Sequence, residues 1–140
     1  MKELKTLCLE QFAASVHAAA RQSGFYDELE KIESCIDGCN LEGQVENDEA
    51  LHEALILFWT GTRIALIHSE LSEALEGIRK DLMDTHLPHR KMEVTEYADT
   101  FIRLMDLVAY RGYASIFHDV VMEKMQYNAQ RGHKYGGKKL

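Results

Sequence analysis

Hydrophobic residues recur at three- and four-residue intervals along most of the chain, the spacing that places side chains on one face of an α-helix. The pattern predicts four principal helices, at about residues 4–22, 49–78, 94–111 and 114–130. Gly24 and Gly112 stand where the first and third of these stretches should end. Turn-forming residues are too sparse for a sandwich or a barrel. We therefore expect an all-α helical bundle.

The same periodicity indicates which side chains should face the core. On the third helix these are Ala98, Phe101, Ile102, Met105 and Val108, and on the fourth they are Ile116, Phe117, Val120, Val121 and Met125. Within the second helix, Thr60-Gly61-Thr62 is either a break or a point of close packing.

The segment between the first two helices is the least regular part of the chain. Gly38, Asn40 and Gly43 interrupt it, so we expect a short helix at about 27–35, then a loop, with Asn47 or Asp48 capping the next helix. We interpret residues 27–62 as an insertion or variable segment within one domain that spans 1–140.

Composition narrows the class of protein. The 140 residues include 16 Lys and Arg against 23 Asp and Glu, a formal charge of −7. Such a chain is poorly suited to coating nucleic acid or an anionic membrane, but it suits cations and ligands that arrive with cations. The longest apolar run, Ala54–Phe58, falls far short of a membrane span. Three cysteines without a signal peptide predict reduced thiols and a cytoplasmic location.

Two pairs of carboxylates suggest a metal site. Glu70 and Glu73 lie three residues apart on one predicted helix, and Glu96 and Asp99 lie three apart on the next. The polar loop 81–90 lets these helices run antiparallel, so the pairs can face each other. Mg²⁺ or Mn²⁺, which favour oxygen ligands, would relieve the repulsion. The alternative is that these acids are merely solvated.

Two neighbours share the stripe of Asp99. Arg103 can neutralise part of the acidic cluster, and Asp106 can contact a metal or a substrate hydroxyl.

The sequence Glu70-x-x-Glu73, followed after 22 residues by Glu96-x-x-Asp99, resembles the signature of MazG-like all-α nucleoside triphosphate pyrophosphohydrolases. Two further stretches resemble the phage and bacterial branch of that family, at 16–26 and 124–138. The resemblance covers most of the chain except about 27–62.

This resemblance implies a dimer or tetramer in which helices of two subunits build each site. It implies a Mg²⁺-dependent reaction, (d)NTP + H₂O → (d)NMP + PPi, in nucleotide-pool housecleaning. Four acids would be catalytic and hold the metals: Glu70, Glu73, Glu96 and Asp99. The substrate phosphates would meet Lys124, Asn128 and Arg131, with Lys134 and Lys138 of the basic tail 132–140 as weaker candidates. Tyr26 stands where the family often has an aromatic residue for the base.

One position departs from the family pattern. Many members carry a second acid immediately before the first motif glutamate, where this chain has Ser69. Either Glu70 or another motif acid must then serve as the base, or the metal alone lowers the pKa of the attacking water. Within the enzyme class, a specialised dUTP/dCTP or phosphoribosyl-ATP pyrophosphohydrolase is the alternative. A ferritin-type di-metal bundle, for which Glu49-x-x-His52 is one match, and a non-catalytic helical interaction module are alternatives of other classes.

Overall fold

The computed structural model describes residues 8–38 and 45–130, with side chains from residue 49 onward in the second range. Five helices form this part of the chain: α1 (Leu9–Gln22), α2 (Asp27–Gly38), α3 (Val45–Lys80), α4 (Met92–Tyr110) and α5 (Ala114–Gln130). Its one β-type pairing is an isolated bridge between Met83 and Lys91. The all-α prediction is confirmed: the four predicted principal helices correspond to α1, α3, α4 and α5, and the short helix predicted at about 27–35 corresponds to α2.

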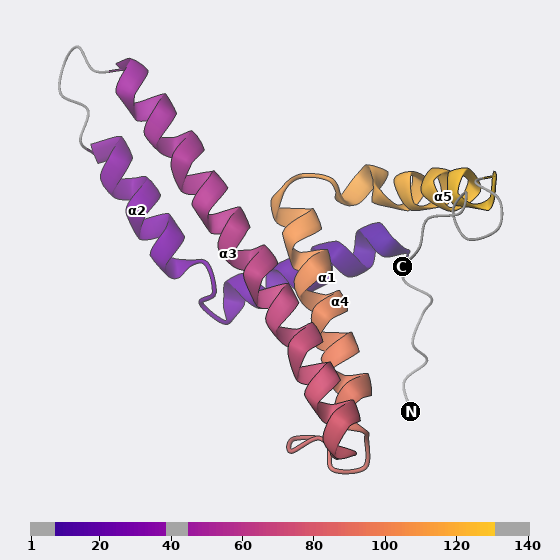
Figure 1. Ribbon diagram of the computed structural model, residues 1–140. Coiled ribbons are helices and arrows are strands. Elements are labelled where there is room, and N and C mark those ends of the chain that lie inside the picture. The colour runs from indigo at the N-terminus through magenta and orange to yellow at the C-terminus, as the bar shows by residue number, and fades with distance from the viewer. Residues whose placement is uncertain (1–7, 39–44, 131–140) are drawn as a thin grey trace.

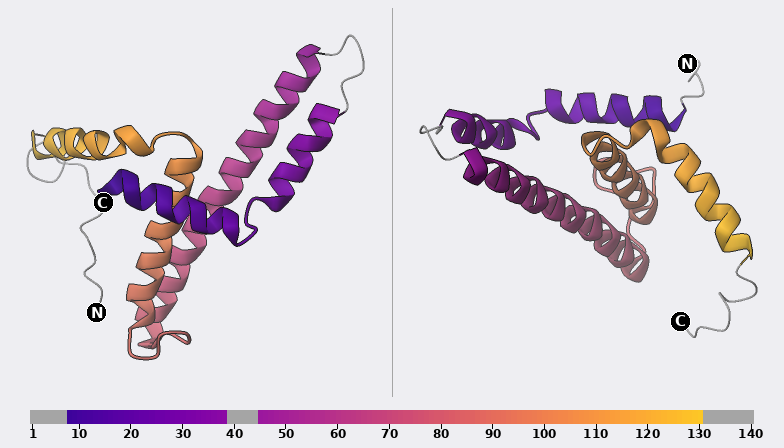
Figure 2. Two further views of the ribbon diagram at one scale, coloured as in Figure 1. Left: turned by 180° about the vertical axis from the view of Figure 1, so that it is seen from behind. Right: turned by 90° about the horizontal axis from the view of Figure 1, so that it is seen from above.

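The long helix α3 connects two parts of the protomer. Its N-terminal half lies beside α2, and its C-terminal half runs antiparallel to α4 (Figure 1). Helix α1 crosses α4, and α5 leaves the far end of α4 and projects away from the α3–α4 pair (Figure 2). The predicted insertion thus forms α2 and the first half of α3.

Three local predictions within that segment are wrong. Helix α2 continues to Gly38, beyond the predicted end near residue 35. Helix α3 begins at Val45, before the caps predicted at Asn47 or Asp48, and runs for 36 residues without a break at Gly61. A Cβ at Gly61 would meet nothing within 4 Å, so this glycine is not a close-packing point either. Two threonines flank it, and the Thr62 hydroxyl satisfies the Phe58 carbonyl at 2.9 Å within the helix.

The contact between α3 and α4 is unusually close at Gly77. A Cβ at this position would lie 3.1 Å from both the Glu93 backbone nitrogen and the Met92 Cβ, so only glycine fits without movement of backbone. The connecting loop is held by the Asp84 carboxylate, which accepts hydrogen bonds from the His86 and Leu87 amides and the Thr95 hydroxyl. These bonds lower the pKa of Asp84.

Glycine also ends two helices as predicted. Gly24 and Gly112 have φ values of 80° and 76°, the left-handed region that glycine adopts without strain.

The core is small for a chain of this length. On α4, Met105 and Val108 are buried as predicted, whereas Phe101 and Ile102 are 43% and 42% exposed and Ala98 is also exposed. No residue of α5 is buried, which contradicts the inward face predicted from Ile116, Phe117, Val120, Val121 and Met125. The periodicity is real, but the described residues cover these faces only in part: Phe117 and Val121 are half-buried, whereas Ile116, Val120 and Met125 stay exposed.

The apolar character of α3 exceeds what uninterrupted runs indicate. By length and composition its stretch Glu49–Lys80 could cross a membrane, because the most apolar 18-residue window in it has a mean hydropathy of 1.3, and none of that window is buried. Isolated polar residues divide this stretch into short runs, which is why the longest run seemed far too short.

Met105 should be the most costly position of the α4 core to truncate. Its side chain is fully buried, so Met105→Ala should lower the free energy of unfolding by roughly 2–5 kcal/mol. Met83, 45% exposed in the loop, is the matched control, and Met83→Ala should change it by less than about 0.5 kcal/mol. Urea unfolding followed by circular dichroism measures both, and equal losses would contradict this description of the core.

Candidate functional site

Three carboxylates from two helices converge at the α3–α4 contact. Glu70 projects from α3, and Glu96 and Asp99 project from α4, and one ligand oxygen of each lies within 4.8 Å of the others. Glu70 and Glu96 are each only 7% exposed, whereas Asp99 is exposed. The three-residue spacing on α4 and the antiparallel course of α3 produce this grouping, as the sequence predicted.

The electrostatics of this trio favour a bound cation. Burial raises the pKa of Glu96 to about 7, helped by its hydrogen bond with Glu70 and by the negative charges of Glu73, Glu70 and Asp99. Burial and the charge of Glu70 also raise the pKa of Asp99, against the lowering effect of Arg103. A cation bound to these oxygens would therefore compete with the proton of Glu96. A donor set made only of carboxylate oxygens fits Mg²⁺ or Mn²⁺.

The fourth acid of the motif, Glu73, lies outside the trio at its solvent-exposed edge. Glu73 is exposed and outside the trio, and its Oε1 accepts a hydrogen bond from the Ser69 hydroxyl at 3.4 Å. Its charge still acts on Glu96. Arg103 takes the neutralising position predicted for it, with Nε 2.7 Å from Glu70 Oε1.

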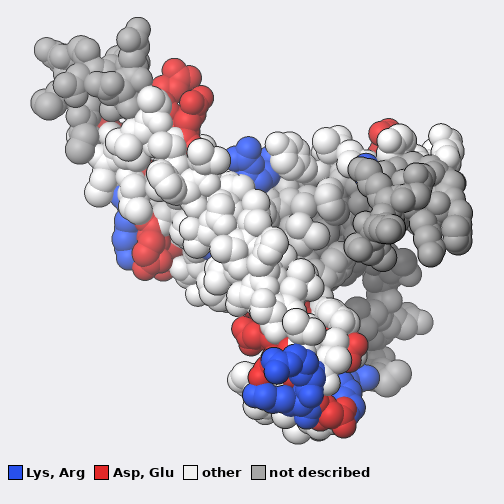
Figure 3. Space-filling model, viewed as in Figure 1, with Lys and Arg blue, Asp and Glu red and all other residues white. Residues whose placement is uncertain are grey.

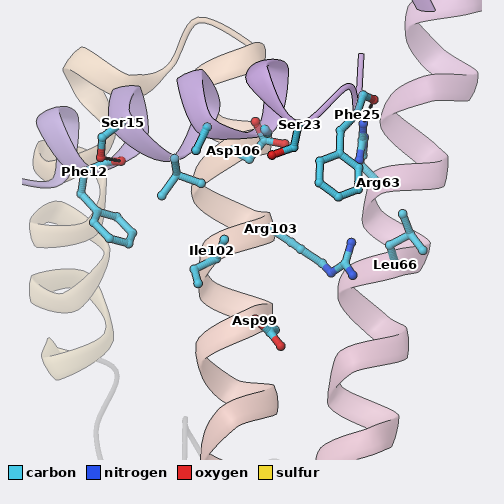
Figure 4. Close-up of a pocket in the computed structure, with 13 residues that line it drawn as sticks. Phe12, Ser15, Ser23, Phe25, Arg63, Leu66, Asp99, Ile102, Arg103 and Asp106 are labelled. Atoms are coloured by element: carbon cyan, nitrogen blue, oxygen red, sulfur yellow. Dashed lines mark hydrogen bonds between the residues drawn. The ribbon is translucent and has the colours of Figure 1, made fainter. Parts of the chain in front are cut away.

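A pocket of about 520 Å³ opens beside the trio, between α1, α3 and α4. Asp99 and Arg103 line one part of it, Leu66 and Ile102 supply apolar walls, and Phe25 and Arg63 line another part (Figure 4). Figure 4 shows Arg103 reaching from α4 toward α3, with Phe25 and Arg63 adjacent to each other near the end of α1. The volume lies in the range of small-ligand sites.

Arg63 is held among aromatic rings. Its guanidinium carbon lies 4.3 Å from the ring centre of Trp59, 5.0 Å from that of Tyr26 and 5.9 Å from that of Phe25. Nη2 donates to the Phe25 carbonyl, whereas Nε is buried without a hydrogen-bond partner among the described residues.

Asp106 lines the same pocket, and its carboxylate is also held by two side chains from the N-terminal part of the chain. The Tyr26 hydroxyl donates to both Asp106 oxygens at 2.9 Å, and His17 Nδ1 lies 2.7 Å from Oδ1. Burial and the Asp106 carboxylate raise the pKa of Tyr26 above its ordinary value. The ring of Tyr26 is 1% exposed, so a base could stack on it only after the ring is uncovered.

The sequence pattern does not single out Arg63 or His17 as functional residues. The signal for Arg63 was a lone cation in the apolar stretch between Trp59 and Leu66. No spacing rule pairs His17 with Asp106, because they are 89 residues apart.

The two predicted phosphate ligands that the structure describes, Lys124 and Asn128, do not reach the trio within the protomer. Lys124 and Asn128 lie on α5, which points away from the α3–α4 pair (Figure 1). Lys124 Nζ lies 4.8 Å from the ring centre of Tyr127. Arg131, Lys134 and Lys138 lie outside the described residues.

In comparisons with known proteins, no family model, no curated protein and no solved structure matches the chain.

The trio should make the stability of the metal-free protein fall as pH rises. Glu96 keeps its proton up to about pH 7 in the folded protein but releases it near pH 4.5 in the unfolded chain. The protonated carboxyl therefore stabilises the folded state fully below about pH 4.5, and this stabilisation is lost as pH rises through about 7. Glu96→Gln should make the melting temperature nearly independent of pH between about 4.5 and 7. Glu93→Gln, one turn earlier on α4, should not.

The same experiment tests the cation. At pH 7.5, Mg²⁺ at 100 times its Kd should raise the melting temperature by roughly 10 °C. Glu96→Gln should abolish most of this rise, and an equal rise in both proteins would contradict the metal site.

Proposed function

We propose that this protein is a Mg²⁺-dependent nucleoside triphosphate pyrophosphohydrolase, which converts (d)NTP and water into (d)NMP and pyrophosphate in the cytoplasm. The observation that carries the proposal is the convergence of Glu70, Glu96 and Asp99 beside a pocket of about 520 Å³. These three acids belong to the motif that resembles the MazG-like signature. Geometry and motif therefore point to the same residues.

The residues of the site have separate roles in this proposal. Glu70, Glu96 and Asp99 would hold the metal, which when bound supplies positive charge to the phosphate oxygens and lowers the pKa of water. Arg103 is placed to bind a phosphate oxygen, since its guanidinium uses Nε on Glu70 and has further N–H donors. Glu73 is exposed and outside the trio, so we propose that it acts as the general base and accepts the proton of the attacking water. The pocket would hold the nucleoside.

The working form is a dimer or a larger assembly. Large apolar side chains of α3 and α5 stay exposed within the described part of the protomer. Leu57 and Phe58 on α3 are 71% and 75% exposed, and Met125 on α5 is 60% exposed. Figure 3 shows a largely uncharged surface between the charges at the α3–α4 loop and those near the opposite end of the protomer.

A second copy suits these faces better than lipid does. The apolar stretch of α3 carries Arg63, and it leads directly into Glu70 and Glu73. Ionised side chains are costly within a bilayer. A second copy would also offer its own Lys124 and Asn128, which the protomer keeps away from its own carboxylates.

Pyrophosphate release tests the activity. Purified protein with Mg²⁺ and each dNTP should release pyrophosphate, and Glu70→Gln or Asp99→Asn should lower kcat/KM by about 100-fold or more because each removes a negative metal ligand. Glu53→Gln, an exposed acid on the same helix, is the control and should leave the rate unchanged. Absence of release with every nucleotide would overturn the proposal.

Light scattering tests the assembly. The mass should be a multiple of 16.0 kDa, and Phe58→Glu should shift it toward the monomer because a charge would enter an apolar contact. Leu87→Glu, at a residue 48% exposed in the α3–α4 loop, should have no such effect. A monomeric wild-type protein with full activity would contradict the shared assembly.

A further inference from the structure

Arg63 is a cation without an acidic partner. No carboxylate among the described residues lies within ion-pair distance of its guanidinium, whereas Arg103 at the other part of the same pocket pairs with Glu70. Arg63 is half-buried, and its one hydrogen bond goes to the carbonyl of Phe25. A guanidinium carries five N–H donors, so most of its donors have no partner in the described residues.

The aromatic contacts fix the orientation of this group. Trp59 lies against the guanidinium at 4.3 Å, and Tyr26 and Phe25 lie on other sides. The rings contribute cation–π attraction but accept no strong in-plane hydrogen bond. The planar fork is thus held in place. Nε is buried and Nη2 already donates to Phe25, so Nη1 and the second N–H of Nη2 are the donors left for a ligand in the pocket.

The position of Arg63 matches one part of a nucleotide. Arg63 and Glu70 are seven residues apart on one unbroken helix, so they share a face and are separated by about 10 Å along the axis. With the phosphates at Glu70 and Asp99, this distance is comparable to the span from phosphate to base. The pocket that runs from Asp99 to Arg63 has apolar walls at Leu66 and Ile102, which suit a ring.

We propose that Arg63 reads the base, and that it selects bases which present ring carbonyl oxygens. This inference rests on the proposed function. An arginine fork pairs most favourably with the O6 and N7 acceptors of guanine, and it can also meet the carbonyl of uracil. Adenine and cytosine place an amino donor at the corresponding position, which an arginine repels. The predicted substrates are therefore guanine nucleotides first and uracil nucleotides second.

The test compares matched pairs of bases. For the wild-type protein, kcat/KM for pyrophosphate release should favour dGTP over dATP by roughly 10-fold or more, and dUTP over dCTP in the same direction. Arg63→Gln should bring both ratios close to one, mainly because the rates with dGTP and dUTP fall, and an unchanged circular dichroism spectrum and melting temperature would show that the variant is folded. Arg63→Lys, which keeps the charge but loses the fork, should retain only part of the dGTP preference.

Arg79→Gln is the control on the same helix, since Arg79 is exposed and pairs with Glu76. It should keep the wild-type ratios. A wild-type protein that does not distinguish dGTP from dATP, or an Arg63→Gln variant that keeps the preference, would overturn the proposal. An equal loss for all four nucleotides would also overturn it, because it would mean that Arg63 binds phosphate.

A binding measurement separates this inference from the proposed hydrolysis. The sequence contains one tryptophan, Trp59, and its ring lies against Arg63, so its fluorescence reports on this end of the pocket. Titration with dGMP should change the emission at a lower concentration than titration with dAMP, and Arg63→Gln should remove the difference. Selective binding without pyrophosphate release would refute the hydrolase and keep the base assignment, whereas release without selectivity would do the reverse.

Discussion

The close antiparallel contact of α3 with α4 is the constraint on which the rest of the structure depends. Gly77 allows the two backbones to approach, and the loop that follows returns the chain at the distance this contact requires. Glu70 then faces Glu96 and Asp99 across the two helices. The contact that packs α3 against α4 also brings three carboxylates together, so the fold cannot form without the electrostatic repulsion among them.

The protomer buries few apolar side chains that could offset this repulsion. Its buried apolar side chains include only a few large ones, Tyr26, Leu29 and Met105 among them, and α5 contributes none. Two of the buried polar residues belong to the trio, and the third, Asp106, is satisfied by Tyr26 and His17. A cation in the trio and a second copy on the apolar faces would each remove one source of instability.

The sequence predicts the parts of this structure that depend on local spacing. Helical periodicity, the ends at Gly24 and Gly112, and the two carboxylate pairs were all predictable, because residues three or four apart on a helix share a face whatever the tertiary structure. The division of the acids was not: Glu73 stays at the rim while Glu70 enters the trio, which depends on the rotation of α3 against α4. The burial of Tyr26 and the pairing of His17 with Asp106 depend on how α1 crosses α4. The inward faces predicted for α4 and α5 were partly wrong, because periodicity identifies an apolar face but not what covers it.

The unbroken course of α3 has a consequence for how the pocket can open. Arg63, Leu66 and Glu70 lie on one continuous helix, so this wall cannot change its length or bend at Gly61 without loss of helical hydrogen bonds. The opposite wall belongs to α1, which is attached to α4 by the stacked rings of Phe12 and Phe101 and by His17 on Asp106. A wider opening of the pocket would therefore require α1 to move against these two contacts and against its packing on α5, while α3 keeps its course.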